Sequence, residues 1–233
     1  LFEEDCGPRF TAAPGLFNAR DADDFPLGGG IASDDATVSS FVDWTMIYLP
    51  YCNQDVFAGG GHTGTSGGMD RPRNGAVDLP AGTRILRDYL WRAMDEEGGA
   101  GFRPDELVAL FGGFSAGAYG VLFNYHWFLD DLQWPKTIAF PDAGLAVNNG
   151  ELLGVGSLGA VKIPAWGMRN YLPPYCFEGP CSGGDVLVNA LSPRLLFEPE
   201  QQLLMLSNQL DSTQAGDAFF SNDADFVNAL RGY

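Results

Sequence analysis

The sequence predicts an α/β protein with a mostly parallel sheet that carries helices on both faces. Short apolar runs rich in strand formers alternate along the chain with longer segments in which apolar residues recur at helical spacing. The chain has 233 residues, 45% of them hydrophobic, which is enough to bury one core of its own. We therefore expect residues 1–233 to form a single domain.

The first predicted strand follows an irregular N-terminal region. Residues 1–43 are rich in Gly, Pro and acidic residues and show little periodicity, which is typical of a surface loop. Residues 44–50 form a short apolar run ended by proline and are predicted to be a buried strand. Residues 51–75 are too polar and too rich in glycine for a core, so we expect a loop there.

Helices and strands alternate in the next part of the chain. Residues 81–97 place apolar side chains at helical spacing with charged ones between them, which predicts an amphipathic helix. A strand is predicted over 107–112 and a mostly apolar helix over 116–131. Two later apolar runs, 137–144 and 201–211, supply two further strands. This order of strands and helices is typical of a parallel sheet covered by helices.

Acidic residues outnumber basic ones by 30 to 13, which gives a formal net charge of -17. Neutralising phosphates requires clustered Lys and Arg, so nucleic acid is not an expected partner. A solvated acidic coat explains this charge, and adaptation to salt water is the alternative. No run of eighteen or more apolar residues occurs, so no membrane span is expected. The start of the chain lacks the pattern of a signal peptide, so a signal for export would be encoded elsewhere.

The four cysteines favour a protein secreted into an oxidising compartment. Cys176 and Cys181 stand close together around a Gly-Pro turn, a spacing that suits a short-loop disulfide. Cys6 and Cys52 lack the CxxC spacing of a zinc site, and the two histidines show no ligand pattern around them. We therefore expect a disulfide rather than a metal site, and no cofactor.

The segment GFSAG, residues 113–117, matches the pattern of a serine nucleophile on a sharp turn between a strand and a helix. The pattern also arises by chance as an ordinary glycine turn, so its flanks decide. A predicted strand leads into the turn and a predicted helix follows it, which favours Ser115 as a nucleophile. The first N–H groups of that helix point at the site, so Ala116 would donate its N–H to the oxyanion of acyl transfer.

A serine nucleophile needs an acid and a base, which follow it along the chain in α/β-hydrolases. Asp142 and Asp211 both come at the ends of predicted strands, where side chains line a site. His126 stands eleven residues after Ser115 on the same predicted helix, about 16 Å away, and is expected to be a packed helix residue. His62 precedes the serine in a glycine-rich loop and is a candidate for lining the site. Neither histidine follows Asp211.

Three segments together resemble the pectin acetylesterase and Notum family of α/β-hydrolases. They are VDWTMIYLPYCNQDVFAGG, GFSAGAYG and NQLDSTQ, and the resemblance runs over about residues 5–214. It implies an α/β-hydrolase fold without a cofactor, with Ser115 as nucleophile, Ala116 as oxyanion donor and Asp211 as the catalytic acid. Asp142 resembles an Asp-Ser-Gly segment of the family and is the second candidate for the acid.

The chain departs from the pattern of this family at both ends. The family has a Gly-Gly segment ahead of the cysteine that corresponds to Cys6, and a catalytic histidine some tens of residues after the acid. Residues 1–233 contain neither, so we expect a piece of a longer protein that is inactive by itself. The expected function is that of a serine carboxylic-ester hydrolase that removes O-acetyl groups from a polysaccharide such as pectin. The alternatives are a non-catalytic binding protein with a hydrolase fold and a Notum-like lipid deacylase.

Overall fold

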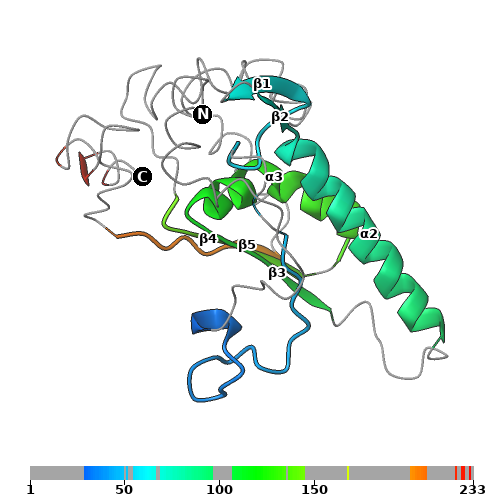
Figure 1. Ribbon diagram of the computed structural model, residues 1–233. Helices are drawn as coiled ribbons and strands as arrows, with labels where there is room; N and C mark the ends of the chain where they lie inside the picture. The colour runs from blue at the N-terminus through cyan, green and yellow to red at the C-terminus, as the bar shows by residue number, and fades with distance from the viewer. Residues whose placement is uncertain are drawn as a thin grey trace.

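A three-stranded parallel sheet lies at the centre of the computed structural model (Figure 1). Its strands are β3 (Val108–Phe114), β4 (Lys136–Asp142) and β5 (Gln201–Leu203), hydrogen-bonded in the order β3-β4-β5. The structure describes residues 29–49, 51, 55–66, 69–96, 107–134, 136–144, 167, 200–208, 224, 227–228 and 231. For this part of the chain the prediction of an α/β protein with a parallel sheet is confirmed.

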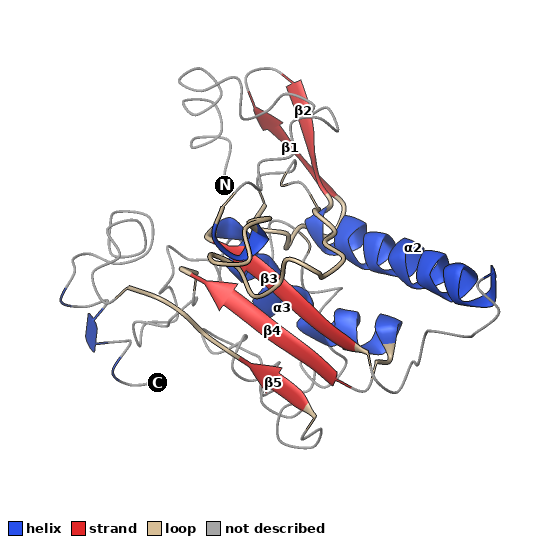
Figure 2. Ribbon diagram, turned by 90° about the horizontal axis from the view of Figure 1, so that it is seen from below, coloured by secondary structure: helices blue, strands red, loops and turns tan. Residues whose placement is uncertain are grey.

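Helix α3 (Ala116–Leu132) packs on β3 and β4, and helix α2 (Gly75–Glu96) packs beside α3, so both lie on the same side of the sheet (Figure 2). Most side chains of α3 are buried, which explains why its sequence is apolar on nearly every side. Phe128 of α3 stacks on Phe111 of β3 with ring centroids 4.4 Å apart. The hydroxyl of Tyr125 donates to the carbonyl of Thr137 in β4 at 3.0 Å. These contacts fix α3 against the sheet.

Arginine side chains of α2 bind the last turn of α3. Nε of Arg84 lies 3.0 Å from Oδ1 of Asp131, and Nη1 of Arg87 donates to the Asp131 carbonyl at 3.3 Å. Positive charge is favourable at the C-terminus of a helix, where backbone carbonyls lack partners. The helix ends at Gln133, which adopts the left-handed conformation and donates its N–H to the carbonyl of Leu129 at 3.0 Å.

The start of α2 differs from the prediction. The helix begins at Gly75, six residues before the predicted start at Ala81, and contains Pro80. A helix can begin there because its first N–H groups have partners outside it. Gly59 accepts from Ala76, and the carbonyl of Asn74 accepts from Val77 and Asp78. Residues 107–112 were predicted as a strand, and β3 extends that strand through Gly113 to Phe114.

The prediction of a loop over residues 51–75 is wrong for part of this segment. Strands β1 (His62–Ser66) and β2 (Met69–Arg73) form an antiparallel hairpin beside the N-terminus of α2 (Figure 1). Ser66 pairs with Met69, so only two glycines connect the strands, a length typical of tight hairpins. The hairpin was missed because its strands, HTGTS and MDRPR, lack the alternation of apolar and polar residues on which strand prediction depends.

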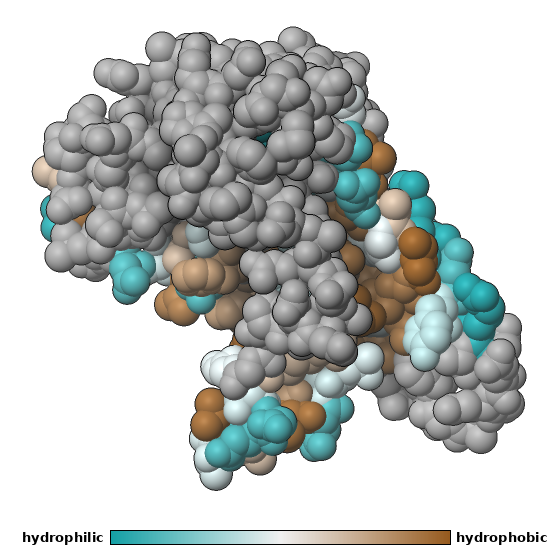
Figure 3. All heavy atoms as spheres, viewed as in Figure 1, coloured by the Kyte–Doolittle hydropathy of each residue, from teal (hydrophilic) through white to brown (hydrophobic). Residues whose placement is uncertain are grey.

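The strand predicted over residues 44–50 is not found. Residues 44–49 belong to none of the strands that the structure describes, and their large apolar side chains are half-exposed, Ile47 at 53%. An apolar run becomes a strand only where a neighbouring strand pairs with it, and none of the strand pairings in the described residues includes residues 44–49. Figure 3 shows apolar surface beside the polar outer side of α2.

The last predicted strand is shorter than expected. Of the described residues 201–208, only Gln201–Leu203 pair regularly with β4, and Leu206 adds a single bridge to Asp142. Residues 209–211 lie outside the described part. Of residues 1–43, the described residues 29–43 contain a short 3-10 turn, η3 (Gly30–Ala32), and further turns, in agreement with the irregular structure predicted for this region. None of the helices in the described residues is long and apolar enough to cross a membrane.

Candidate active site

Ser115 lies between the end of β3 and the start of α3, at the carboxyl edge of the parallel sheet. Its backbone has φ 55° and ψ -116°, outside the regions that side chains of L-residues normally allow. Such a conformation costs about 1–3 kcal/mol and persists only where neighbouring structure holds it. The predicted sharp turn between a strand and a helix is therefore present, with the serine at its strained position.

The first glycine of GFSAG is required by the fold. A Cβ at Gly113 would collide with the backbone carbonyl of Gly117 and would lie 3.0 Å from the backbone nitrogen of Ala118. The backbone doubles back here so closely that only a residue without a side chain fits. A Cβ at Gly117 would meet nothing within 4 Å, so the fold of the described residues does not require the second glycine.

The turn that follows β4 holds the serine from the sheet side. The N–H of Ser115 donates to the carbonyl of Asp142 at 2.8 Å. A Cβ at Gly144 would stand 2.5 Å from the carbonyl oxygen of Ser115, so this glycine also permits a close approach of two backbones. Between them, Ala143 has a positive φ of 55° and donates its N–H to the carbonyl of Leu206 at 2.8 Å. Two strained turns therefore meet at the carboxyl edge of the sheet.

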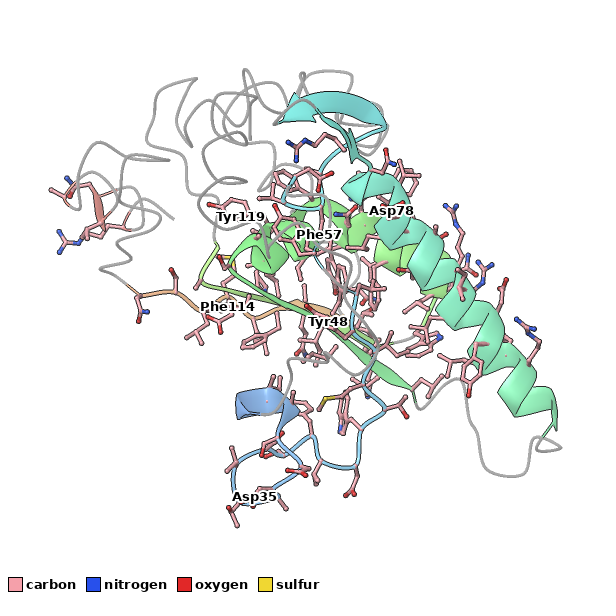
Figure 4. All side chains as sticks on the ribbon, viewed as in Figure 1. Asp35, Tyr48, Phe57, Asp78, Phe114 and Tyr119 are labelled. Atoms are coloured by element: carbon pink, nitrogen blue, oxygen red, sulfur yellow. The ribbon has the colours of Figure 1, made fainter. Side chains whose placement is uncertain are left out.

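The side chain of Ser115 does not cap α3. Ser115 is solvent-exposed, and its hydroxyl makes no capping hydrogen bond to α3 although it occupies the N-cap position. Its backbone N–H is bound to Asp142, so the next amides, beginning with Ala116, are the ones at the open N-terminus of the helix. Phe114, which precedes the serine, is 70% exposed and lies at the end of β3 (Figure 4).

The structure places one of the two candidate acids beside the serine. Asp142 is half-buried at the end of β4 and pairs in register with Phe114. Asp211 lies outside the described residues. Leu206, five residues before it in the sequence, bridges to Asp142.

The two histidines differ in position. His126 is 2% exposed in the middle of α3, which confirms the prediction of a packed helix residue. His62 lies at the start of β1, where it pairs in register with Arg73 of the hairpin. The four cysteines, and with them the predicted disulfide, lie outside the described residues. In the part of the chain that the structure describes, no group of three or more His, Cys, Asp or Glu could hold a metal ion.

Asp55 was not predicted to be a functional residue, and the structure shows that it is fully buried. Its carboxyl oxygens accept hydrogen bonds from the backbone N–H groups of Phe57 at 3.0 Å, Gly59 at 3.2 Å and Gly75 at 2.8 Å. A Cβ at Gly59 or Gly75 would collide with this carboxyl group, so the two glycines make room for it. The signal in the sequence was its place in VDWTMIYLPYCNQDVFAGG, one of the three segments that carry the family resemblance.

Burial raises the pKa of Asp55 above its ordinary value of 3.8, because a charged carboxylate is poorly solvated in the interior. The hydrogen bond from Gly75, the positive charge of Arg73 and the hydrogen bonds from Phe57 and Gly59 act in the opposite direction. The removal from water outweighs them. A buried carboxyl group with three backbone donors is a strong local constraint on the chain around it.

Comparison of the chain with models of protein families, with curated proteins and with solved structures found no significant match.

Proposed function

We propose that this protein is a serine carboxylic-ester hydrolase with an α/β-hydrolase fold, and that it removes O-acetyl groups from a polysaccharide such as pectin. The observation that carries the proposal is the backbone of Ser115, at φ 55° and ψ -116° between β3 and α3. A serine gains nothing structural from this position, since its hydroxyl does not cap the helix. The position does expose the hydroxyl beside the N-terminus of a helix, which is what acyl transfer needs.

Supporting observations come from the surroundings of the serine. Gly113 is required by the close return of the chain, and the carboxyl ends of β3 and β4 meet at the serine. Ligands of parallel sheets bind at this edge. The resemblance to the pectin acetylesterase and Notum family points to the same reaction class, and it rests on three segments of the sequence.

In the proposed reaction, Oγ of Ser115 attacks the carbonyl carbon of the acetyl ester while a base takes its proton. The N–H of Ala116 stabilises the negative charge on the carbonyl oxygen. The bond to the sugar oxygen then breaks, the base returns the proton to that oxygen, and the acetyl group stays on the serine. Water hydrolyses this acyl-enzyme by the same steps in reverse and releases acetate.

The base in this class of reaction is a histidine that a carboxylate orients. We assign the carboxylate to Asp211 and keep Asp142 as the second candidate, because Asp142 already stands at the site. His126 is buried eleven residues along α3 from the serine and is not assigned a role in catalysis. His62 is the histidine of this chain whose replacement by Ala tests a role as base.

The test measures release of acetate from acetylated pectin, and hydrolysis of p-nitrophenyl acetate, by the protein as its gene encodes it. Ser115→Ala is compared with Ser40→Ala, in which the same atom is removed from an exposed serine of the N-terminal turns. We expect Ser115→Ala to lower kcat by about 10³-fold or more. Ser40→Ala should leave kcat unchanged.

The outcomes separate the proposal from its alternatives. Equal rates for wild type and Ser115→Ala would reject catalysis and favour a binding protein that keeps the fold. A rate that rises steeply from p-nitrophenyl acetate to the octanoate would favour a lipid deacylase over an acetylesterase. A fluorophosphonate probe should modify Ser115 in the wild type, as mass spectrometry of the labelled peptide would detect.

A further inference from the structure

Residues 55–59, the Asp55 turn, stand between the start of α2 and the first half of α3. The turn is strained, because Val56 and Phe57 both have positive φ values, 48° and 58°, although neither is a glycine. Two of the three hydrogen bonds to the Asp55 carboxyl come from inside the turn. Another bond ties Val56 to the chain ahead of it, since its N–H donates to the hydroxyl of Tyr51 at 2.7 Å. The turn is therefore held in one conformation.

The Asp55 turn contacts α3 through Phe57. Nδ2 of Asn124, in α3, donates to the carbonyl of Phe57 and to the carbonyl of Gly120, both at 2.9 Å. The ring of Phe57 lies over Gly120, where an added Cβ would come within 2.7 Å of it. Figure 4 shows Phe57 on the helix side of the sheet, in the same region as Tyr119 at the start of α3. Gly120 is five residues after Ser115, so the contact lies within the first turns of the helix.

We propose that Asp55 is a positioning residue that holds the start of α3, and with it the backbone of Ser115, through the Asp55 turn. Its catalytic consequence rests on the proposed function. The strained backbone of Ser115 needs support from both sides. Asp142 and Gly144 support it from the sheet, and the Asp55 turn supports it from the helix side.

If Asp55 only capped the N-terminus of α2, it would not need hydrogen bonds from inside its own turn. The bond from Gly75 alone would serve as a cap for α2. The bonds from Phe57 and Gly59 instead stabilise a strained turn. The carbonyl oxygen of Phe57 then accepts from Asn124 of α3 and its ring lies over Gly120 of α3, while its backbone packs against Gly75 at the start of α2. The carboxyl group thus links the segment before α2 to the helix that begins at the serine.

The first test is hydrogen exchange measured by mass spectrometry on wild type and Asp55→Asn. The amide nitrogen of the variant replaces one carboxyl oxygen, so at least one backbone N–H loses its acceptor while the shape of the side chain is kept. Asp78→Asn, the same change at an exposed position of α2, is the control. We expect exchange at residues 115–120 to accelerate about tenfold in Asp55→Asn and to stay unchanged in the control.

Acceleration confined to residues 55–59 and 75–79, with residues 115–120 unchanged, would overturn the proposal. If Asp55→Asn does not fold, Asn124→Ala decides the matter. It removes the link between Phe57 and α3 and leaves the three donors of Asp55 in place. The same acceleration at residues 115–120 is expected for this variant, and normal protection there would reject the link.

The second test is kinetic and is run well below the melting temperature of the variant. If wild type hydrolyses esters and this activity depends on Ser115, Asp55→Asn should lower kcat about tenfold and leave KM nearly unchanged. The variant would misalign the serine nucleophile without changing the groups that bind the substrate. An unchanged kcat would refute the catalytic part of the proposal. If wild type shows no hydrolysis that depends on Ser115, the proposed function fails, and hydrogen exchange alone still decides whether Asp55 positions the turn.

Discussion

The N–H of Ser115 donates to the carbonyl of Asp142 at 2.8 Å and so joins the turn after β3 to the turn after β4. This bond explains how a strained serine is held at the edge of the sheet. It also means that the N–H of the serine itself is already bonded. The oxyanion of the proposed reaction would therefore be bound by the amides that follow, beginning with Ala116.

Gly113→Ala should destabilise the protein by about 3 kcal/mol, because the new methyl group would collide with the backbone of Gly117 and no side chain can move aside. Gly112→Ala is the matched control on the same strand. Its methyl group would lie 3.5 Å from a side-chain atom of Leu110, an ordinary contact. Urea denaturation gives the free energy of unfolding of both variants. Equal effects at the two positions would contradict the close return of the chain at Gly113.

The elements next to this turn are the part of the fold that the sequence predicts best. Residues 116–131 were expected as a helix and α3 spans Ala116–Leu132, since an apolar pattern and a preceding glycine turn agree over this stretch. The run 44–50 misled the prediction, because an apolar segment does not reveal whether a partner strand lies beside it. The hairpin of β1 and β2 was missed because the sequences of its strands lack the alternation of apolar and polar residues that predicts a strand.

The candidate site was predictable only in part for similar reasons. Ser115 follows from a local pattern of glycines between a strand and a helix. The role of Asp55 does not follow from a local pattern, because it depends on Gly75, twenty residues away in the sequence, and on the contact of Phe57 with α3. Contacts between segments this far apart leave no periodic signal in the sequence. Only the tertiary structure reveals that this carboxyl group is buried.

Ser115→Gly should be more stable than Ser115→Ala by about 1 kcal/mol. Glycine adopts the backbone conformation of residue 115 without the steric cost, while alanine keeps that cost. Part of the gain is lost, because glycine also increases the freedom of the unfolded chain. Both variants lack the hydroxyl, so the comparison isolates the backbone. Thermal and urea unfolding measure the difference, and a Gly variant less stable than the Ala variant would show that the turn is not strained.

Gln133→Gly should stabilise the protein by about 0.5–1 kcal/mol. Gln133 ends α3 in the left-handed conformation, which glycine adopts more readily than any residue with a side chain. The side chain of Gln133 is exposed, so little packing is lost. The change in free energy of unfolding by urea is the measurement. A loss of stability would mean that the glutamine side chain contributes more than its backbone costs.

The stability of the protein should depend on pH through Asp55. Its pKa in the folded protein is raised above the ordinary value of 3.8, chiefly by burial. At a pH between 3.8 and the higher pKa of the folded protein, Asp55 is ionised in the unfolded chain but still protonated in the folded one. The contribution of Asp55 to the stability of the fold therefore falls as pH rises through this range. Below 3.8 both states are protonated and the contribution is constant.

Asp55→Asn removes this titration. The stability advantage of wild type over the variant should therefore be largest at acid pH and should shrink as pH rises above 3.8. Urea unfolding of both proteins across the acid range measures it, with Asp78→Asn as the control for an exposed carboxyl group. An advantage that grows with rising pH would mean that the folded protein lowers the pKa of Asp55.

Two glycines of α3 should respond in opposite ways to replacement by Ala. A Cβ at Gly117 would meet nothing within 4 Å, so Gly117→Ala should stabilise the helix by about 1 kcal/mol, the usual difference between these residues in a helix. A Cβ at Gly120 would come within 2.7 Å of the ring of Phe57. Gly120→Ala should therefore lower the free energy of unfolding by about 1–3 kcal/mol.

The two variants also distinguish an effect on folding from an effect on catalysis. If Gly117→Ala is at least as stable as wild type but loses ester hydrolysis, the second glycine of GFSAG is needed to keep the space in front of Ser115 open and not for folding. If Gly120→Ala is destabilised because its methyl group collides with the ring of Phe57, replacing Phe57 by Leu in the same chain should recover part of the stability. The smaller side chain makes room for the methyl group. Failure of the double variant to recover any stability would contradict the contact between the Asp55 turn and α3.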